Sequence, residues 1–304
     1  MARQRRPQYN RPTPGRGCID STMKETKDRS FLLISPAAMW LVVFFIGPLV
    51  VILVVSFASR GAFGRIIYDY TLGNYARAFD SLYVSAYWRT VWIATLTTLL
   101  CIVMSYPAAY YLAFRASGRW KPLLLVLTVV PFWTSFLIRT YAWMVLLRSE
   151  GLINSGLVHA GIIKEPLGLL YNNFAVMVGQ VYGELPFMIL PIFVALDHID
   201  KRLIEAAHDL GANRISTFTR VTLPLSRPGL IAGSVLVFIP SLGAFVTPDL
   251  LGGAKSAMIG NLIQNQFTLL NQPFGSALSI LLGIAVLMLL AAALKMGLKP
   301  DELA

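Results

Sequence analysis

The chain has 304 residues, of which 56% are hydrophobic and 13% are charged, and its net charge is +11. So apolar a composition with so little charge argues against an ordinary soluble enzyme and points to a membrane protein. An excess of basic residues also occurs in nucleic-acid-binding proteins, so its distribution along the chain decides what it means.

The first 30 residues are basic, contain several prolines and show no periodic apolar pattern. They are predicted to form a disordered tail, residues 1–30. Cys18 falls in this tail and Cys101 in an apolar run, so we expect no disulfide between them.

Six segments are long and apolar enough to cross a bilayer, which takes about 20 residues of helix. Three runs carry no charge, and two more are interrupted only by Arg139 or by Glu184. The last span begins near 273, because the residues before it are rich in amides. The predicted spans are 32–58, 88–114, 122–147, 172–196, 228–248 and 273–294. The fold class is therefore an all-α polytopic membrane protein, with a transmembrane domain at 31–296 and a short tail at 297–304.

The basic residues are unevenly distributed between the two sides of the predicted spans. With the N-terminus in the cytoplasm, the inside segments hold 18 Lys and Arg and the outside segments hold six. This bias predicts that both termini are cytoplasmic. It also explains the net charge without a nucleic-acid partner. The outside loops are then 59–87, 148–171 and 249–272, and the long inside loop is 197–227.

No soluble catalytic set is evident. His159 falls outside whereas His198 and His208 fall inside, so the three histidines cannot share a metal. The stretch 252–256 faintly echoes a phosphate loop, but it lacks the glycine spacing and faces outward. We expect no enzyme activity, no metal and no cofactor bound by this chain, so a partner chain must bind any ATP that is used.

The inside loop 197–227 shows two short helical patterns separated by a glycine. The apolar residues of the first pattern are Leu203, Ala206, Ala207 and Leu210. Gly211 is placed to stop this helix in the left-handed conformation, and Asn213 can cap a second helix. That second helix carries Ile215, Phe218 and Val221 and is expected to end at Leu223-Pro224. From these residues alone, an amphipathic loop lying on the surface fits as well as a docking element.

The same loop carries a family pattern: Glu205-Ala206-Ala207, Gly211, Val221 and Leu223-Pro224. This resembles the EAA loop of the permease subunits of binding-protein-dependent ABC importers, with Val221 in place of the usual isoleucine. The resemblance implies a type I ABC importer permease fold in the bacterial inner membrane. It also implies that the loop docks into the ATPase, with Glu205 as a polar anchor, the two alanines as the close-contact face and Gly211 as the bend.

The resemblance further implies partners. They are a second, homologous permease, two ATPase subunits that use ATP and Mg, an extracytoplasmic solute-binding protein and the membrane lipid.

Other stretches narrow the resemblance to the first permease of spermidine/putrescine importers. They are 131–134 with Ile138-Arg139, 185–191, 239–243, 251–253 and 258–263. Permeases for other small organic solutes, such as opines or amino-acid derivatives, share many of these stretches and remain the alternative. Ala244 stands where many relatives carry a glutamate, which bears on a polycationic substrate.

Glu184 is the residue predicted to lie nearest the solute, because an ionisable group at the middle of a span usually faces a cavity. Pro186, Pro240 and Gly243 are expected to free backbone carbonyls at that depth. Trp133, Tyr141 and Tyr182 are candidates for cation–π contacts with an ammonium group. The structural alternative is an ion pair between Glu184 and Arg139.

The outer loop carries three amides predicted to face the binding protein: Asn261, Gln264 and Asn265. The loop could equally be a re-entrant segment packed under the bundle. Two other classes compete with the importer. A self-sufficient channel or secondary transporter is expected to show internal symmetry or coupling-ion residues, and an intramembrane enzyme needs paired catalytic groups within the spans.

Overall fold

The computed structural model describes residues 35–36, 39–116 and 118–297, except for the side chains of residue 255 and residues 293–297. The predicted tail at 1–30, Cys18 and the terminal residues 298–304 lie outside the described part. The chain divides into two units, residues 1–54 and 55–304. A helix long enough to cross a membrane runs over Met39–Ser56, and it includes η1 (Val42–Ile46) and α2 (Gly47–Ser56).

The second unit holds almost all the remaining elements. It begins with a short antiparallel pair, β1 (Ser59–Arg60) and β2 (Ile66–Ile67), separated by η2 (Ala62–Gly64). The elements up to the inside loop are α3 (Gly73–Ala78), α4 (Ser81–Tyr110), η3 (Tyr111–Arg115), α5 (Trp120–Val129), η4 (Val130–Trp133), α6 (Phe136–Leu147), α7 (Leu152–His159) and α8 (Asn173–Asp197). The elements that follow are α9 (Lys201–Asp209), α10 (Arg214–Thr217), η5 (Phe218–Thr222), α11 (Leu223–Leu225), α12 (Arg227–Gly243), η6 (Pro248–Gly252), η7 (Ala254–Ser256), α13 (Ile259–Thr268) and α14 (Gln272–Gly297).

Four helices of the described part are long and apolar enough to span a membrane, and two bent helix pairs raise the number to as many as six. The helices over 39–56, 81–115, 173–197 and 272–292 agree with the first, second, fourth and sixth predicted spans. The all-α prediction is confirmed.

The third predicted span, 122–147, is wrong as a continuous helix. Trp120–Trp133 and Phe136–His159 meet at an angle of 88°. Thr134 and Ser135 are extended there, with ψ near 147° and 135°. Pro131 cannot continue the pattern of helical hydrogen bonds, and its own carbonyl accepts a hydrogen bond from the Thr134 hydroxyl at 2.7 Å. The local partner makes a break tolerable in an apolar segment.

The fifth predicted span, 228–248, ends early. α12 stops at Gly243, three residues after Pro240, and Ala244 is extended. The Phe245 carbonyl beyond the end accepts a 2.7 Å hydrogen bond from the Asn261 side chain, so the freed backbone is not left unpaired. The opposite was found at Pro186, which was expected to disturb its helix: α8 runs through both Pro186 and Pro191 without interruption.

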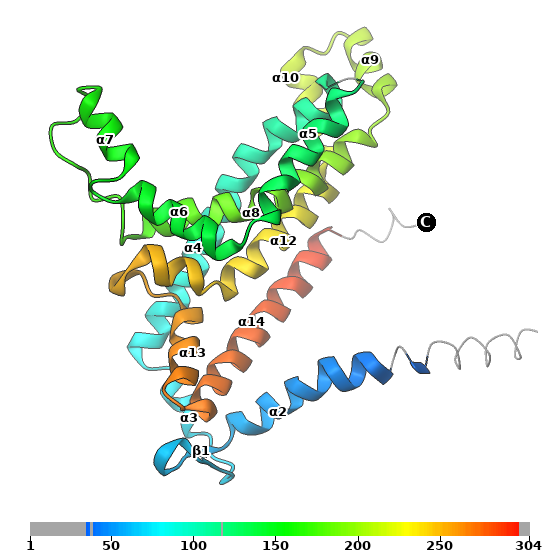
Figure 1. Cartoon of the computed structure of the whole chain (residues 1–304). Coiled ribbons are helices and arrows are strands. Elements are labelled where there is room, and N and C mark those ends of the chain that lie inside the picture. Colours follow the sequence, from blue (N-terminus) through cyan, green and yellow to red (C-terminus); the bar gives the residue numbers. More distant parts are fainter. Residues whose placement is uncertain (1–34, 37–38, 117, 298–304) are drawn as a thin grey trace, which may run out of the picture. The chain divides into compact units, whose positions relative to one another are not determined.

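α8 is the central helix, and it packs against both α4 and α12. Figure 1 shows these three helices running together, with α9 and α10 at one end of the bundle and α3 at the other. The largest buried cluster is built from them, and its fully enclosed members include Cys101, Met188, Ile192, Leu196 and Val237. Between α4 and α8, the Thr97 hydroxyl donates a 3.1 Å hydrogen bond to the buried Gln180 side chain.

Two glycines set the spacing between α8 and α12. A Cβ added at Gly229 would lie 2.5 Å from both the Ala195 Cβ and the Pro191 carbonyl oxygen. A Cβ added at Gly233 would lie 2.8 Å from the Met188 sulfur. Membrane helices gain little by exchanging lipid for apolar side chains, so close backbone approach through small residues is what holds them together.

Gly229→Ala is therefore expected to destabilise the protein, by about 1–3 kcal/mol for overpacking a close contact. The added methyl group meets a backbone carbonyl that cannot move without bending α8. Thermal unfolding in detergent measures the effect. Gly283→Ala in α14 is the matched control, because nothing lies within 4 Å of the added Cβ. Equal unfolding temperatures for the two variants would contradict the close contact.

Candidate functional site

The predicted helix–glycine–helix segment is present; we call residues 200–225 the foot. Asp200 caps α9 by accepting a 3.0 Å hydrogen bond from the Arg202 amide. α9 ends where Gly211 adopts φ +82°, and the Gly211 and Ala212 amides donate back to the carbonyls of His208 and Ala207. This pair of bonds is a Schellman motif, which needs a left-handed residue at the glycine position.

The second helix of the foot begins where it was predicted to begin but extends slightly further than predicted. Asn213 caps α10 as predicted, accepting from the Ser216 amide at 2.8 Å. The helical path then continues through η5 and α11 and ends at Leu225, one residue after the predicted end at Leu223-Pro224. The bend of 62° falls between Leu225 and Arg227. Pro224 lies just after the π-helical turn η5 and one residue before the helical path ends.

The foot exposes an apolar surface at the end of the bundle. Leu203 is 49% exposed, Leu210 89% and Ile215 76%, and Glu205 and Ala206 are exposed beside them. The predicted apolar face of α9 is thus turned largely outward, with Ala207 half-buried. Ile204, which the sequence analysis did not single out, is the α9 residue that packs against the main core. Exposed large apolar side chains gathered on one element mark an interaction surface.

The foot is joined to α4 by a buried aromatic contact. The Phe218 ring meets Tyr106 edge-on at 5.4 Å and Tyr110 at 6.4 Å. The Tyr106 hydroxyl lies 2.9 Å from the Ser226 hydroxyl, and Ser226 is fully buried at the bend before α12. Lys121, in the first turn of α5, forms an ion pair with Asp197 at the end of α8. Four helices therefore meet where the foot begins and ends.

Glu184 lies half-buried on α8, one turn from Gln180 and one turn from Met188. Those two residues contact α4 and α12, so the same face of α8 turns Glu184 into the bundle. Its Oε2 atom is buried and has no hydrogen-bond partner, and the Ser241 hydroxyl on α12 is in the same situation. Unpaired buried polar atoms are costly, so each of them calls for an explanation.

Arg139 does not pair with Glu184. Within the described part of the chain, Lys121 with Asp197 is the ion pair found within 4.0 Å. The Arg139 guanidinium lies instead over the rings of Phe132 and Phe136, at 4.9 Å and 5.8 Å. Its Nε and Nη1 atoms are buried without partners. The structural alternative for Glu184 is thus not realised.

The three aromatic candidates do not gather around Glu184. Tyr182 stacks edge-on with Trp143 at 5.6 Å and lines an apolar cavity with Phe174. It lies two residues from Glu184 and hence on the opposite face of the helix, so pairing them was wrong. Trp133 is 82% exposed at the end of η4. Pro240 and Gly243 are exposed at the end of α12.

Tyr141 belongs to a different cavity, of about 370 Å³, which we call the outer cavity because most of its lining residues belong to the predicted outside loop 249–272. It lies between α6, the segment around η6, and α13. The lining residues are Leu137, Tyr141, Phe245, Val246, Asp249, Leu250, Asn261, Gln264, Asn265 and Thr268. All three amides predicted to face the binding protein are therefore brought together with Tyr141.

Asn261 differs from the other two amides. It is 6% exposed, its oxygen accepts from the Met258 amide and its nitrogen donates to the Phe245 carbonyl. It fixes the loop rather than presenting a docking surface, so that assignment is corrected. Gln264 and Asn265 are exposed. Sequence reasoning missed Asp249 and Phe245; the signal available was that Asp249 is the one acidic residue of loop 249–272.

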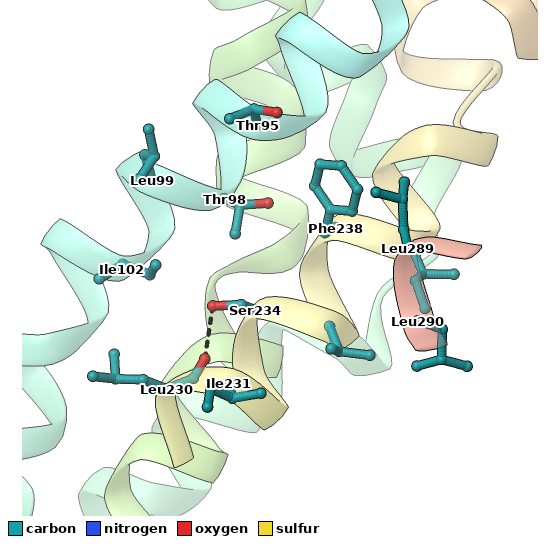
Figure 2. A pocket seen from close by; sticks show the side chains of 12 residues that line it. Thr95, Thr98, Leu99, Ile102, Leu230, Ile231, Ser234, Phe238, Leu289 and Leu290 are labelled. Carbon is teal, nitrogen blue, oxygen red and sulfur yellow. Dashed lines mark hydrogen bonds between the residues drawn. The ribbon is translucent and has the colours of Figure 1, made fainter. Parts of the chain in front are cut away.

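A third cavity, of about 430 Å³, lies between α4, α12 and α14 (Figure 2). Its walls are leucine, isoleucine, valine and phenylalanine side chains, and its hydroxyls come from Thr95, Thr98 and Ser234. Each hydroxyl donates to a carbonyl of its own helix, as Figure 2 shows for Ser234 and Leu230. The hydroxyl hydrogens are therefore all engaged within their own helices, and the rest of the wall is apolar.

Comparison with known proteins decides between the classes. Residues 105–300 match the family described as the inner membrane component of binding-protein-dependent transport systems. The chain belongs to this family. Its relatives include the spermidine/putrescine transport system permease protein PotB of Haemophilus influenzae, 43% identical over 83% of this chain and 87% of that protein. PotB of Escherichia coli is 42% identical over 83% of this chain and 92% of that protein. The inner membrane ABC transporter permease protein YdcU of Escherichia coli is 30% identical over 88% of this chain and 89% of that protein.

The fold of this family member agrees with solved transporters. A chain of a bacterial ABC transporter involved in the import of alginate superposes with a TM-score of 0.71, covering 91% of this chain and 98% of that one at 19% identity. A chain of the MetNI methionine ABC transporter superposes with a TM-score of 0.55, covering 70% of this chain and 94% of that one. The predicted importer permease fold is confirmed.

A double-mutant cycle tests whether the side chains of Glu184 and Arg139 act independently in this permease. Glu184→Gln and Arg139→Gln are expected to change the unfolding temperature independently, with a coupling within about 0.5 kcal/mol, as for residues without shared partners. Thermal unfolding of the four proteins in detergent gives the coupling. Recovery of stability in the double variant would show that the side chains are paired.

Proposed function

We propose that this chain is the transmembrane permease subunit of an ATP-driven importer for polyamines, spermidine and putrescine among them. The observation that carries the proposal is the identity of 41–43% to PotB permeases over more than four fifths of the chain. The permease YdcU, at 30%, is more distant. A permease for another small organic solute remains the second candidate, favoured by Ala244.

The proposed assembly contains a second, related permease, two ATPase subunits and an extracytoplasmic solute-binding protein, in the bacterial inner membrane with both termini cytoplasmic. ATP and Mg belong to the ATPase subunits, and this chain contributes no catalytic group. The exposed apolar surface of the foot supports a docking role. In a loop outside the membrane, large apolar side chains as exposed as Leu210 and Ile215 are typical of a surface that a partner covers.

Glu184, Pro240 and Gly243 are proposed to line the solute path. The buried, unpartnered Glu184 carboxylate supports this role, because an ammonium group passing through the bundle would supply the missing partner. The exposed end of α12 supports it too, since that surface is available to face the second permease.

Uptake by the complete complex tests the substrate. The chain is reconstituted in liposomes with its second permease, ATPase and binding protein, and labelled putrescine and spermidine are offered outside. ATP-dependent uptake is expected for both amines, and a tenfold excess of an opine should not compete. Accumulation of the opine without polyamine uptake would show that the substrate is an opine and not a polyamine. Solute movement by this chain alone, without ATPase, would refute the importer mechanism.

Gly211→Val should uncouple the foot from the ATPase. A β-branched residue at φ +82° costs roughly 1–2 kcal/mol, and the second helix is displaced. We expect loss of ATPase co-purification and of uptake. Gly211→Asn is the matched control, because asparagine tolerates this conformation. Nothing lies within 4 Å of a Cβ at this position, so only the backbone conformation separates the two variants. Normal assembly and uptake with valine would remove the bend from the mechanism.

A further inference from the structure

The outer cavity has the chemistry of a site for an organic ammonium ion. Its single charged lining residue is Asp249, and no described lysine or arginine lines it. Arg139 lies between Leu137 and Tyr141 in the sequence, on the opposite face of α6, with its guanidinium over Phe132 and Phe136. A cation entering this cavity therefore meets a carboxylate and no competing positive group.

The other free groups suit the same ligand. The rings of Tyr141 and Phe245 are 52% and 42% exposed, and aromatic faces attract ammonium groups. The amides of Gln264 and Asn265 are exposed beside them and can accept hydrogen bonds from N–H donors. Leu137, Val246 and Leu250 supply apolar contact for the methylene chain of an alkylamine. A volume of about 370 Å³ is within the range of small-molecule sites.

The cavity is a built feature, because two departures from regular helix create it. The 88° bend at Thr134–Ser135 turns α6 so that Leu137 and Tyr141 reach the cavity. The end of α12 at Gly243 frees Phe245 and places Asp249 in the first turn of η6. Asn261 holds this arrangement by binding the Phe245 carbonyl, and the Asp249 amide donates to the same carbonyl at 3.0 Å. Irregular backbone in a membrane protein persists where it lines a cavity.

We propose that the outer cavity is a receiving site for one ammonium group of an alkylamine solute, with Asp249 as its counter-ion and Tyr141 and Phe245 as its aromatic walls. The proposal rests on the proposed polyamine substrate and adds a position for it. The solute pauses here after leaving the binding protein and before it reaches the level of Glu184. The site lies at the predicted outer end, where an importer receives its cargo.

Asp249→Asn in the complete reconstituted complex tests the site. Putrescine uptake below saturation is expected to fall about tenfold or more, the loss typical of a hydrogen bond to a charged group. Asp249→Glu should restore most of the uptake, because the charge remains. ATP hydrolysis stimulated by the binding protein should stay within about twofold, since docking is unchanged. Asp69→Asn is the matched control: it is exposed in the first outside loop and does not line the cavity.

The outcomes separate the explanations. Normal uptake by Asp249→Asn would overturn the site. An equal loss of uptake and of stimulated ATP hydrolysis would also overturn it, because Asp249 would then contact the binding protein. If Asp249→Asn fails to assemble, Gln264→Lys decides. A cation in the cavity should lower uptake, and Leu269→Lys, directly after the end of α13 and outside the lining, should not. No polyamine uptake by the unaltered complex refutes the proposed function instead.

Discussion

The close approach of α12 to α8 is the contact on which the rest of the structure depends. Gly229 admits the Pro191 carbonyl and Ala195, and Gly233 admits Met188. In a bilayer this packing replaces the hydrophobic effect as the force between helices. The buried Thr97–Gln180 hydrogen bond adds α4 to the pair, and the Tyr87 hydroxyl, bound to the Leu278 carbonyl, adds α14. The foot connects the end of α8 to the start of α12, and the outer cavity is formed by the segment that follows the end of α12. The α8–α12 interface therefore fixes the positions of both sites.

The foot is a stiff extension of that interface and not a loose loop. A Schellman turn, two capped helices and the Phe218 contact with Tyr106 and Tyr110 leave it few ways to move independently. Ser226, at the bend before α12, is fully buried and lies within hydrogen-bonding distance of Tyr106. A force applied to the exposed face of α9 is therefore transmitted to α4 and α12 together. This is the mechanical property that the proposed docking of the foot to an ATPase subunit requires.

Much of this could be predicted from the sequence, for physical reasons. Charge-free runs identify the spans because burying a charge in lipid is expensive. Gly211 and Asn213 identify the foot because their roles are local. The break at Thr134–Ser135 was missed because mean hydropathy reports burial and not backbone conformation. The disturbance after Gly243 was predicted, because proline and glycine act on the local backbone. Tyr182 was misplaced because depth in a span was considered without the face of the helix. Asp249 was passed over because its partners come from α6 and α13, which are distant in the sequence.

α12 gives the two sites a common mechanical element. Its first residue follows the bend at Ser226, and its last residue, Gly243, precedes the segment that carries Phe245 and Asp249. Seventeen residues of helix extend about 26 Å, most of the thickness of the hydrocarbon core. Glu184 faces the same helix from α8, near the turn that packs on Gly233. A tilt of α12 about that glycine contact displaces its two ends in opposite directions. A movement of the foot at one end would then be accompanied by a movement of the outer cavity at the other, as alternating access in the proposed importer requires.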